Sequence, residues 1–266
     1  MTIPLYQADA FTDRLFAGNP AAVCILEEEL PDALLLSIAR ENNLSETAYL
    51  RRGEDTWNLR WFTPGGEVNL CGHATLASGH IILTELETDR DRVDFSTVSG
   101  PLGVSRDGGG YRLDLPSWPG REVPAREEWG AALGIEPRAV RRTDRDIYCL
   151  LDSEEEVRAA APDFRALARI ELDGVRIDGA GIGAIGGDGD TVSRYFAPAL
   201  GIDEDPVTGS AHSTWVPWLA ELTGRREQTC RQLSARGGTM RAELRGERVQ
   251  LIAGAVTYLR GSIELG

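Results

Sequence analysis

Glu46 is the acidic residue of this chain whose neighbours most clearly suggest chemistry. The predicted strand 44–51 carries Leu44, Ala48 and Leu50 at its other even-numbered positions. Because successive side chains of a strand point to opposite faces, we expect Glu46 on the apolar face. Desolvation there would raise the pKa of its carboxyl toward the range of a general acid/base. A structural ion pair with an arginine, or a strand end in contact with water, would explain the same residue without catalysis.

Two segments, residues 60–74 and 194–211, repeat one series of residue types about half the chain apart. Each series predicts a strand, a turn at a proline, an acidic loop and a helix that opens at a glycine, Gly72 in the first copy and Gly209 in the second. The N-terminus of a helix offers unpaired backbone N–H groups and a partial positive charge, which together bind carboxylates. The repeat therefore predicts a duplicated half-domain whose two helix N-termini face one cleft and bind an anionic group.

The two copies differ in the side chains that could act on such a ligand. His73 follows the first glycine and Ser210 follows the second. The positive end of the helix dipole should lower the pKa of His73 and favour a neutral imidazole, which both donates and accepts; a capping or packing role is the alternative. Asp205 stands where the first copy has Val68. The shared fold does not require that carboxylate, although an Asp-Pro turn would also account for it.

The composition excludes several classes of function. A net charge of −14 argues against nucleic acid or an anionic membrane as a partner. All 28 basic residues are arginine, so the chain has no lysine for a Schiff base with pyridoxal phosphate or for a P-loop. The four cysteines are scattered and no two histidines have the spacing of metal ligands. We therefore predict neither a disulfide framework nor a metal site.

The compartment is predicted from what the sequence lacks. The first residues contain no basic stretch followed by an apolar run, and no apolar run approaches the length of a membrane span. Together with four cysteines in no paired pattern, these features favour a reducing, cytoplasmic location.

The fold prediction rests on the two helices of the repeat. Residues 72–86 and 209–223 are apolar or small nearly all round, which indicates burial, and strands are predicted on both sides of each helix. We therefore predict an α/β (α+β) fold of two pseudo-symmetric domains, each a mostly antiparallel sheet wrapped around a central buried helix. The segment Pro116–Gly120 divides the chain into residues 1–117 and 118–266, with the last strand allowed to cross to the first domain.

Several long motifs, in this order, resemble the phenazine-biosynthesis-like (PhzF) family. They are Phe11–Arg14 with Gly18–Val23, Asn43–Ala48, Phe62–Pro64 with Glu67-Val68, Leu70–Ala77 and Glu204–His212. That family is similar in fold to diaminopimelate epimerase. The resemblance implies a homodimeric isomerase that needs no cofactor and moves a proton within a small cyclic carboxylate, as the best-understood member does with a dihydro-hydroxyanthranilate.

The resemblance also implies roles for individual residues. Glu46 would be the acid/base, and His73, Asp205 and Ser210 would be its polar companions. The backbone N–H groups around Gly72-His73 and Gly209-Ser210 would hold the substrate carboxylate in the cleft between the two domains.

Two other functions stay open. An amino-acid-like epimerase or racemase would use Glu46 with Cys71, but relatives with that activity place a thiol before each paired glycine, and the second position here is Thr208. A hydroxyl of ordinary pKa cannot replace a thiolate as a carbon base. The third function is non-catalytic binding of a carboxylate or of a partner. The substrate itself cannot be predicted from these residues.

Overall fold

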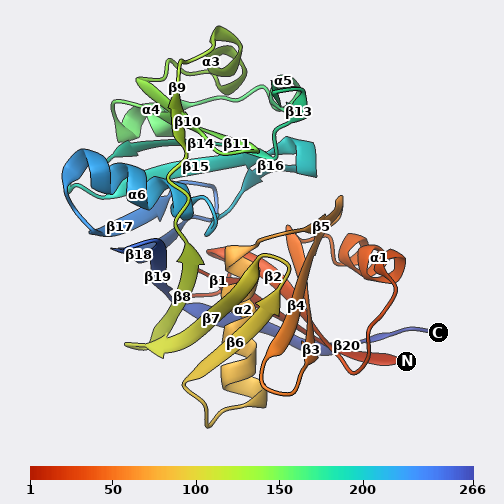
Figure 1. Cartoon of the computed structure of the whole chain (residues 1–266). Coiled ribbons are helices and arrows are strands. Elements are labelled where there is room, and N and C mark those ends of the chain that lie inside the picture. Colours follow the sequence, from red (N-terminus) through yellow and green to blue (C-terminus); the bar gives the residue numbers. More distant parts are fainter. The chain divides into compact units, whose positions relative to one another are not determined.

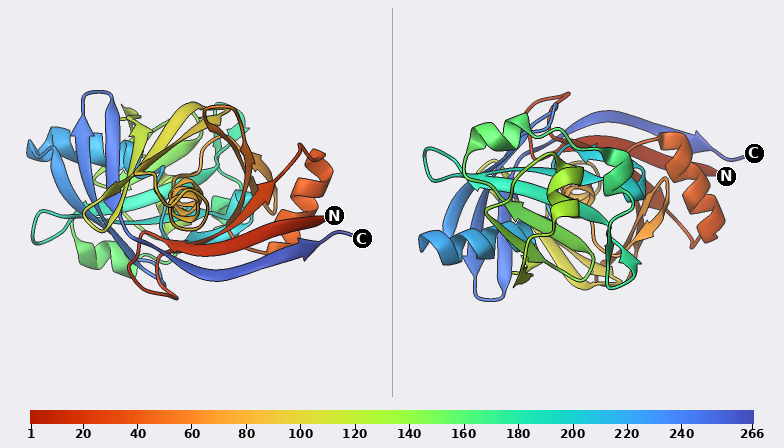
Figure 2. Two further views of the ribbon diagram at one scale, coloured as in Figure 1. Left: turned by 90° about the horizontal axis from the view of Figure 1, so that it is seen from below. Right: turned by 90° about the horizontal axis from the view of Figure 1, so that it is seen from above.

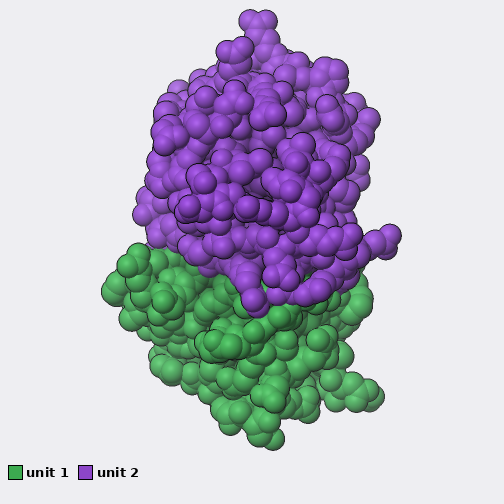
Figure 3. Space-filling view, turned by 90° about the vertical axis from the view of Figure 1, so that its left-hand side faces the viewer, with its two compact units in different colours: residues 1–115, 250–266 green, residues 116–249 purple.

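In the computed structural model, which describes residues 1–266, the chain forms two compact units (Figure 1). Unit 1 contains residues 1–115 and 250–266, and unit 2 contains residues 116–249 (Figure 3, green and purple). The chain therefore leaves unit 1 at the start of the predicted linker and returns to it near the C-terminus.

Unit 1 is a sheet of mostly antiparallel strands around one helix. Its strands are β1 (Thr2–Ala10), β2 (Asn19–Leu26), β3 (Glu46–Arg52), β4 (Trp57–Thr63), β5 (Gly66–Val68), β6 (Arg92–Thr97), β7 (Gly100–Asp107), β8 (Gly110–Pro116) and β20 (Ala255–Glu264). The parallel pairs β2–β3 and β4–β6 are joined through α1 (Asp32–Asn42) and α2 (Gly72–Ile81), the crossovers that parallel pairing requires. The last strand, which the sequence prediction allowed to cross, pairs along its length with β1.

The helix α2 is the centre of unit 1. All ten of its residues are buried, and Figure 2 shows it end-on with strands of unit 1 around it. Its small side chains let the strands approach closely: a Cβ at Gly79 would lie 2.4 Å from a methyl carbon of Val104. The sequence predicted one helix over 72–86, whereas the structure ends the α-helix at Ile81 and continues with a π-helical turn, η1 (Ile82–Leu86).

Unit 2 repeats this arrangement with more helices on its outer side. Its strands are β9 (Arg121–Val123), β10 (Ala139–Arg142), β11 (Asp146–Leu150), β14 (Gly179–Ile185), β15 (Thr191–Ala197), β16 (Ile202–Asp205), β17 (Glu227–Gln232) and β18 (Gly238–Arg245), followed by β19 (Arg248–Ala253), which leads back into unit 1. A separate hairpin consists of β12 (Glu171–Leu172) and β13 (Val175–Arg176). The helices are α3 (Glu127–Leu133), α4 (Glu154–Ala159), α5 (Phe164–Leu167), the short 3₁₀ turn η2 (Pro198–Leu200) and α6 (His212–Thr223).

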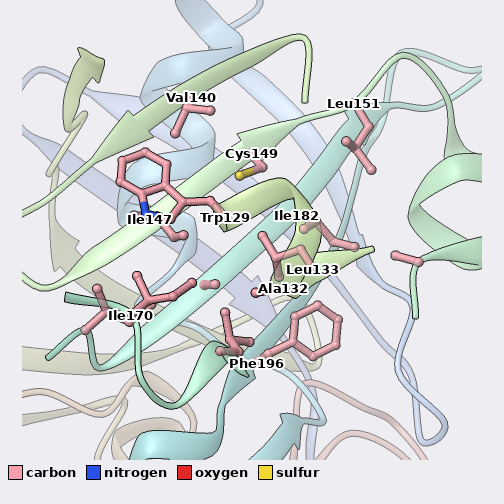
Figure 4. Packing of buried hydrophobic residues seen from close by; sticks show 14 of the residues in the cluster. Trp129, Ala132, Leu133, Val140, Ile147, Cys149, Leu151, Ile170, Ile182 and Phe196 are labelled. Carbon is pink, nitrogen blue, oxygen red and sulfur yellow. The ribbon is translucent and has the colours of Figure 1, made fainter. Parts of the chain in front are cut away.

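The two faces of the unit 2 sheet have separate cores. On the inner face Tyr148 and Leu150 of β11 pack with Trp215 of α6. On the outer face Ile147 and Cys149 of the same strand pack with residues of α3, including Trp129 (Figure 4). Successive side chains of β11 therefore enter the two cores in turn, because neighbouring side chains of a strand point to opposite faces of the sheet. None of the helices has both the length and the hydropathy needed to cross a bilayer.

The order of strand pairing is the same in both units. In unit 1 the successive pairs are antiparallel, parallel, antiparallel, parallel and antiparallel: β1–β2, β2–β3, β3–β4, β4–β6 and β6–β7. In unit 2 the same series of directions occurs in β10–β11, β11–β14, β14–β15, β15–β17 and β17–β18. The prediction of two pseudo-symmetric sheets, each around a buried helix, is confirmed.

The shared register shows which residues occupy matching places. The sequence repeat matches Phe62 of β4 with Phe196 of β15. In unit 1, Phe62 pairs with Thr47 of β3, the residue after Glu46. In unit 2, Phe196 pairs with Ala180 of β14, the residue after Gly179. Glu46 of unit 1 therefore has no carboxylate counterpart on the matching strand of unit 2.

Candidate active site

Glu46 and His73 lie together at the end of unit 1 where β3 and α2 begin. The Nε2 atom of His73 is 3.2 Å from Oε2 of Glu46. The side chain of His73 is 3% exposed and that of Glu46 is 13% exposed. Glu46 thus points toward the central helix, the face that the alternation in β3 predicts, and it retains some contact with solvent. The contact with Nε2 is short but lacks the alignment of a good hydrogen bond.

The other ring nitrogen of His73 faces Asn19 at the start of β2. The Nδ2 atom of Asn19 lies 3.1 Å from Nδ1, and Asn19 is completely buried. Because an ionised Glu46 only accepts hydrogen bonds, we assign the proton of His73 to Nε2, so that Nδ1 accepts from the Asn19 amide. Gly18, with φ of 65°, makes the tight turn before Asn19, where a Cβ would lie 2.1 Å from the carbonyl oxygen of Ala10.

Burial keeps His73 neutral. It lowers the pKa of the imidazole to about 3. The sequence predicted a lowered pKa but attributed it to the helix dipole, whereas desolvation is the cause here. A neutral ring with its proton on Nε2 places an N–H group beside the Glu46 carboxylate without adding a positive charge.

Cys71 is the third polar residue of this cluster. Its Sγ lies 3.4 Å from Nδ1 of His73, and ligand atoms of Glu46, Cys71 and His73 all lie within 4.8 Å of one another. These are donor types that zinc binds. The thiol is nearest to Nδ1 of the ring and the carboxylate is nearest to Nε2. His73 therefore contacts both groups, and the three side chains form one cluster.

The Asp205 loop of unit 2 is held by hydrogen bonds from β17. The hydroxyl of Thr208 donates to Oδ2 of Asp205 at 2.5 Å. Gln232 donates from Nε2 to the carbonyl oxygen of Asp205 at 2.7 Å and accepts at Oε1 from the backbone N–H of Thr208 at 2.8 Å. All three residues are buried, so the loop has a fixed conformation and Asp205 a fixed place within unit 2.

The loops before the two central helices are anchored in the same way. The carbonyl oxygen of Cys71 accepts the hydroxyl of Thr75 at 2.5 Å, and that of Thr208 accepts Nδ1 of His212 at 2.8 Å. In both cases the donor is four residues ahead in the chain. Burial lowers the pKa of His212 to about 4, so its ring is neutral. By anchoring this carbonyl, His212 has a structural role.

The two glycines predicted to cradle a carboxylate both precede helical turns. Gly72 is the first residue of α2, whose N-cap side chain makes no capping hydrogen bond. In unit 2 the α-helix begins at His212 and not at Gly209, and Gly209 and Ser210 form tighter turns whose carbonyls accept from His212 and Ser213. Their part in binding a substrate stays a prediction.

Two residues of this arrangement were missed in the sequence. Asn19 lies in a Gly-Asn-Pro segment that predicts only a turn, and its signal would have been a polar residue followed directly by a buried apolar strand. Gln232 has no local signal, since its partners are far away in the chain and only the pairing of β15 with β17 brings it to the Asp205 loop.

Comparison with known proteins now decides the family. The family model described as phenazine biosynthesis-like protein matches residues 8–261. The chain belongs to the phenazine biosynthesis-like family. A curated relative, an uncharacterised isomerase of Pseudomonas aeruginosa, is 44% identical to it over the full length of both chains. The crystal structure of a PhzF-family protein of Enterococcus faecalis covers both chains completely, with a TM-score of 0.91 and 38% identity.

The family resemblance found in the sequence is therefore confirmed, and this member of the phenazine biosynthesis-like family is an isomerase. A predicted epimerase of Pseudomonas aeruginosa, 22% identical, has a TM-score of 0.76 over 99% of this chain and 100% of its own. At that identity the likeness shows the fold alone, and it confirms the epimerase-like architecture.

Proposed function

We propose that the protein isomerises a small cyclic carboxylate by moving a proton within it, without a cofactor, and that Glu46 is the acid/base. The observation that carries this proposal is the close contact of a partly accessible Glu46 with a buried, neutral His73, whose Nε2 is 3.2 Å from the carboxylate. A carboxylate at a partly accessible position, next to a donor that carries no charge, can both take up and release a proton.

The residues would act in a simple sequence. Ionised Glu46 removes a proton from a carbon of the substrate, while the Nε2–H of His73 orients the carboxylate and Asn19 fixes the ring. Protonated Glu46 then returns the proton to another carbon of the conjugated system. The backbone N–H groups around Gly72 and Gly209 would bind the substrate carboxylate.

Asp205 and Ser210 would contribute from unit 2 to the same substrate. The fixed conformation of the Asp205 loop supports this part of the proposal. The homodimer that the family resemblance implies is also proposed, and light scattering of the purified protein tests it.

The epimerase alternative has one observation in its favour. Cys71 Sγ lies 3.4 Å from Nδ1 of His73, so the thiol belongs to the same cluster as Glu46 and could act beside it. Against two-base racemisation, the hydroxyl of Thr208 already donates to Asp205 and accepts from Gln232 at 3.1 Å. A hydroxyl committed in this way is not a base for carbon.

Incorporation of solvent deuterium into a dihydro-hydroxyanthranilate tests the role of Glu46. We expect the wild-type protein to incorporate deuterium into this compound and to isomerise it. The variant Glu46→Gln, which keeps the shape and one acceptor of the side chain, should do neither. Cys71→Ala is the matched variant at the other ring nitrogen and should keep full exchange. Exchange that survives in Glu46→Gln contradicts the proposal, and exchange lost only in Cys71→Ala favours the epimerase.

A further inference from the structure

Tyr195 of β15 reaches across a neighbouring strand of unit 2. Its hydroxyl donates to Oδ1 of Asp146 on β11 at 2.8 Å, although β14 lies between these two strands (Figure 1). The reach is possible because Gly179 of β14 has no side chain. A Cβ at Gly179 would lie 2.1 Å from the Tyr195 hydroxyl oxygen. The tyrosine therefore fills the place on β14 that Glu46 occupies on the matching strand of unit 1.

The other end of Tyr195 lies beside Asp205. The two residues are direct partners in the antiparallel pairing of β15 with β16. Side chains directly opposite one another in such a pair point to the same face, with Cβ atoms about 4.5–5.5 Å apart. The backbone of Tyr195 thus lies next to Asp205, and its hydroxyl group is fixed by Asp146.

Asp146 is a partly buried acceptor with polar neighbours. Its second oxygen accepts the hydroxyl of Thr143 at 3.3 Å. The pKa of Asp146 is raised to about 6, mainly by burial. The hydrogen bond from Tyr195 opposes this shift, and nearby Asp178, itself paired with Arg145, adds to it.

The matching row of unit 1 has none of these groups. Trp61 of β4 stands in the place of Tyr195, and its partner on β5 is Val68 where unit 2 has Asp205. On β2, Ala21 lies opposite Glu46 where unit 2 has Asp146 opposite Gly179. The fold shared by the two units therefore does not require the row Asp146–Tyr195–Asp205.

We propose that Asp146 and Tyr195 form a positioning pair for Asp205, in which Asp146 fixes the tyrosine ring that confines the Asp205 side chain. The inference rests on the proposed function, in which Asp205 contacts the substrate. Asp146 and Tyr195 act through Asp205 and do not touch the reacting atoms.

The first experiment needs no substrate. The protein is labelled with ¹³C at Cγ of aspartate, and the Asp205 signal is assigned from Asp205→Asn. We expect that signal to shift or broaden in Tyr195→Phe and in Gly179→Ala, which displaces the hydroxyl without removing a polar group. Tyr111→Phe is the matched control, because it removes a buried tyrosine hydroxyl bonded to His80 in unit 1 at 2.8 Å. An Asp205 signal unchanged in both unit 2 variants overturns the proposal.

The second experiment measures turnover of a dihydro-hydroxyanthranilate. Tyr195→Phe, Gly179→Ala and Asp146→Ala should each lower kcat by roughly 10- to 100-fold, as misplacement of an active group does, with KM little changed. Asp146→Asn keeps an oxygen for the Tyr195 hydroxyl and should stay within about threefold of the wild type, since the hydrogen bond is preserved. A double variant Tyr195→Phe/Asp146→Ala should be no slower than Asp146→Ala alone.

The outcomes separate the two proposals. Losses that multiply in the double variant, or an Asp146→Asn as slow as Asp146→Ala, overturn the positioning pair. A wild-type protein that does not turn over the compound counts against the proposed function, while the Asp205 signal still decides whether the pair positions that residue. A normal near-UV circular dichroism spectrum for Tyr195→Phe, Asp146→Ala and Gly179→Ala excludes misfolding as the cause of any loss.

Discussion

Unit 1 and unit 2 secure the loop before their central helix by the same device, yet they place their acidic groups on different strands. In both units a side chain four residues ahead binds the carbonyl that precedes the helix glycine. In unit 1 the acid stands on β3, next to a neutral histidine. In unit 2 the matching strand has Gly179, and the acids Asp146 and Asp205 stand on the strands to either side of the β14–β15 pair.

The difference teaches which features belong to the fold and which to the chemistry. A carbonyl anchor and a glycine at the start of the helix occur in both halves, as a fold built twice requires. His73 against Ser210 and Val68 against Asp205 differ although their surroundings match. We infer that the duplicated half provides the frame, and that the polar groups present in only one half are there for function. Exchanging residues between the halves therefore tests which of them serve the fold and which serve the chemistry.

The largest effect is expected when unit 1 receives the residue of unit 2 at the start of its helix. His73→Ser removes the Nε2–H from Glu46 and the acceptor from Asn19. We expect the rate of isomerisation to fall by roughly 100- to 1,000-fold, the lower part of the range for a group in acid/base catalysis. The reciprocal change, Ser210→His, should not restore it, because Gly179 leaves no carboxylate at the matching place. Deuterium exchange in the single and double variants measures this, and a His73→Ser protein of normal rate would remove the histidine from the mechanism.

A smaller loss is expected when unit 2 receives the residue of unit 1 in its loop. Asp205→Val removes the acceptor of the Thr208 hydroxyl. We expect a fall in kcat/KM of roughly 10- to 100-fold, as for loss of a hydrogen bond to a charged group. Asp205→Asn is the control that keeps an oxygen toward Thr208 and removes the charge. If it behaves as the wild type, the loop geometry matters and the charge does not.

More of unit 1 than of unit 2 could be predicted from the sequence. The repeat predicted the burial of both helices, because a helix that is apolar all round is stable only in a protein interior. It also predicted the glycine that precedes each helix or begins it. The alternation in β3 placed Glu46 correctly, but Thr47 and Tyr49 on its other face are buried as well, under α1. That alternation therefore succeeded without distinguishing the two faces.

Unit 2 was less accessible to sequence reasoning for a physical reason. Asp146, Gly179 and Tyr195 come from three strands, and each is an ordinary residue in its own segment. Only the strand register puts the glycine beneath the tyrosine hydroxyl. Gln232 is similar, because its amide binds a loop 24 residues away in the chain. Contacts of this kind leave no local pattern.

The buried histidines of both units predict a dependence of stability on pH. Burial lowers the pKa of His73 to about 3 and those of His80 and His212 to about 4. The unfolded chain therefore binds more protons than the folded one below about pH 6.5, and the free energy of unfolding should fall as the pH falls from there toward 4. Each such histidine contributes up to about 1.4 kcal/mol per pH unit.

Asp146 has the opposite effect in the same range. Its raised pKa of about 6 means that the folded protein holds a proton that the unfolded chain has released above pH about 4. Asp146→Asn should therefore gain stability relative to the wild type as the pH rises from about 4 to 6, with a constant difference above that. Urea unfolding at a series of pH values measures both effects. A constant difference across the whole range would mean that Asp146 titrates normally.

The smallest effect concerns the anchor that the two units share. Thr75→Val removes the hydroxyl that binds the Cys71 carbonyl but leaves the backbone N–H of Thr75, which binds the same oxygen at 3.2 Å. We expect a loss of about 1 kcal/mol in the free energy of unfolding, as for one net hydrogen bond. Ser78→Ala is the matched control, because its hydroxyl binds the Ala74 carbonyl one turn further along α2 at 2.7 Å. Both should cost similar stability, but only Thr75→Val should also slow isomerisation, since it loosens the loop that carries Cys71 and leads into His73. Equal rates in the two variants would show that this anchor serves the fold alone.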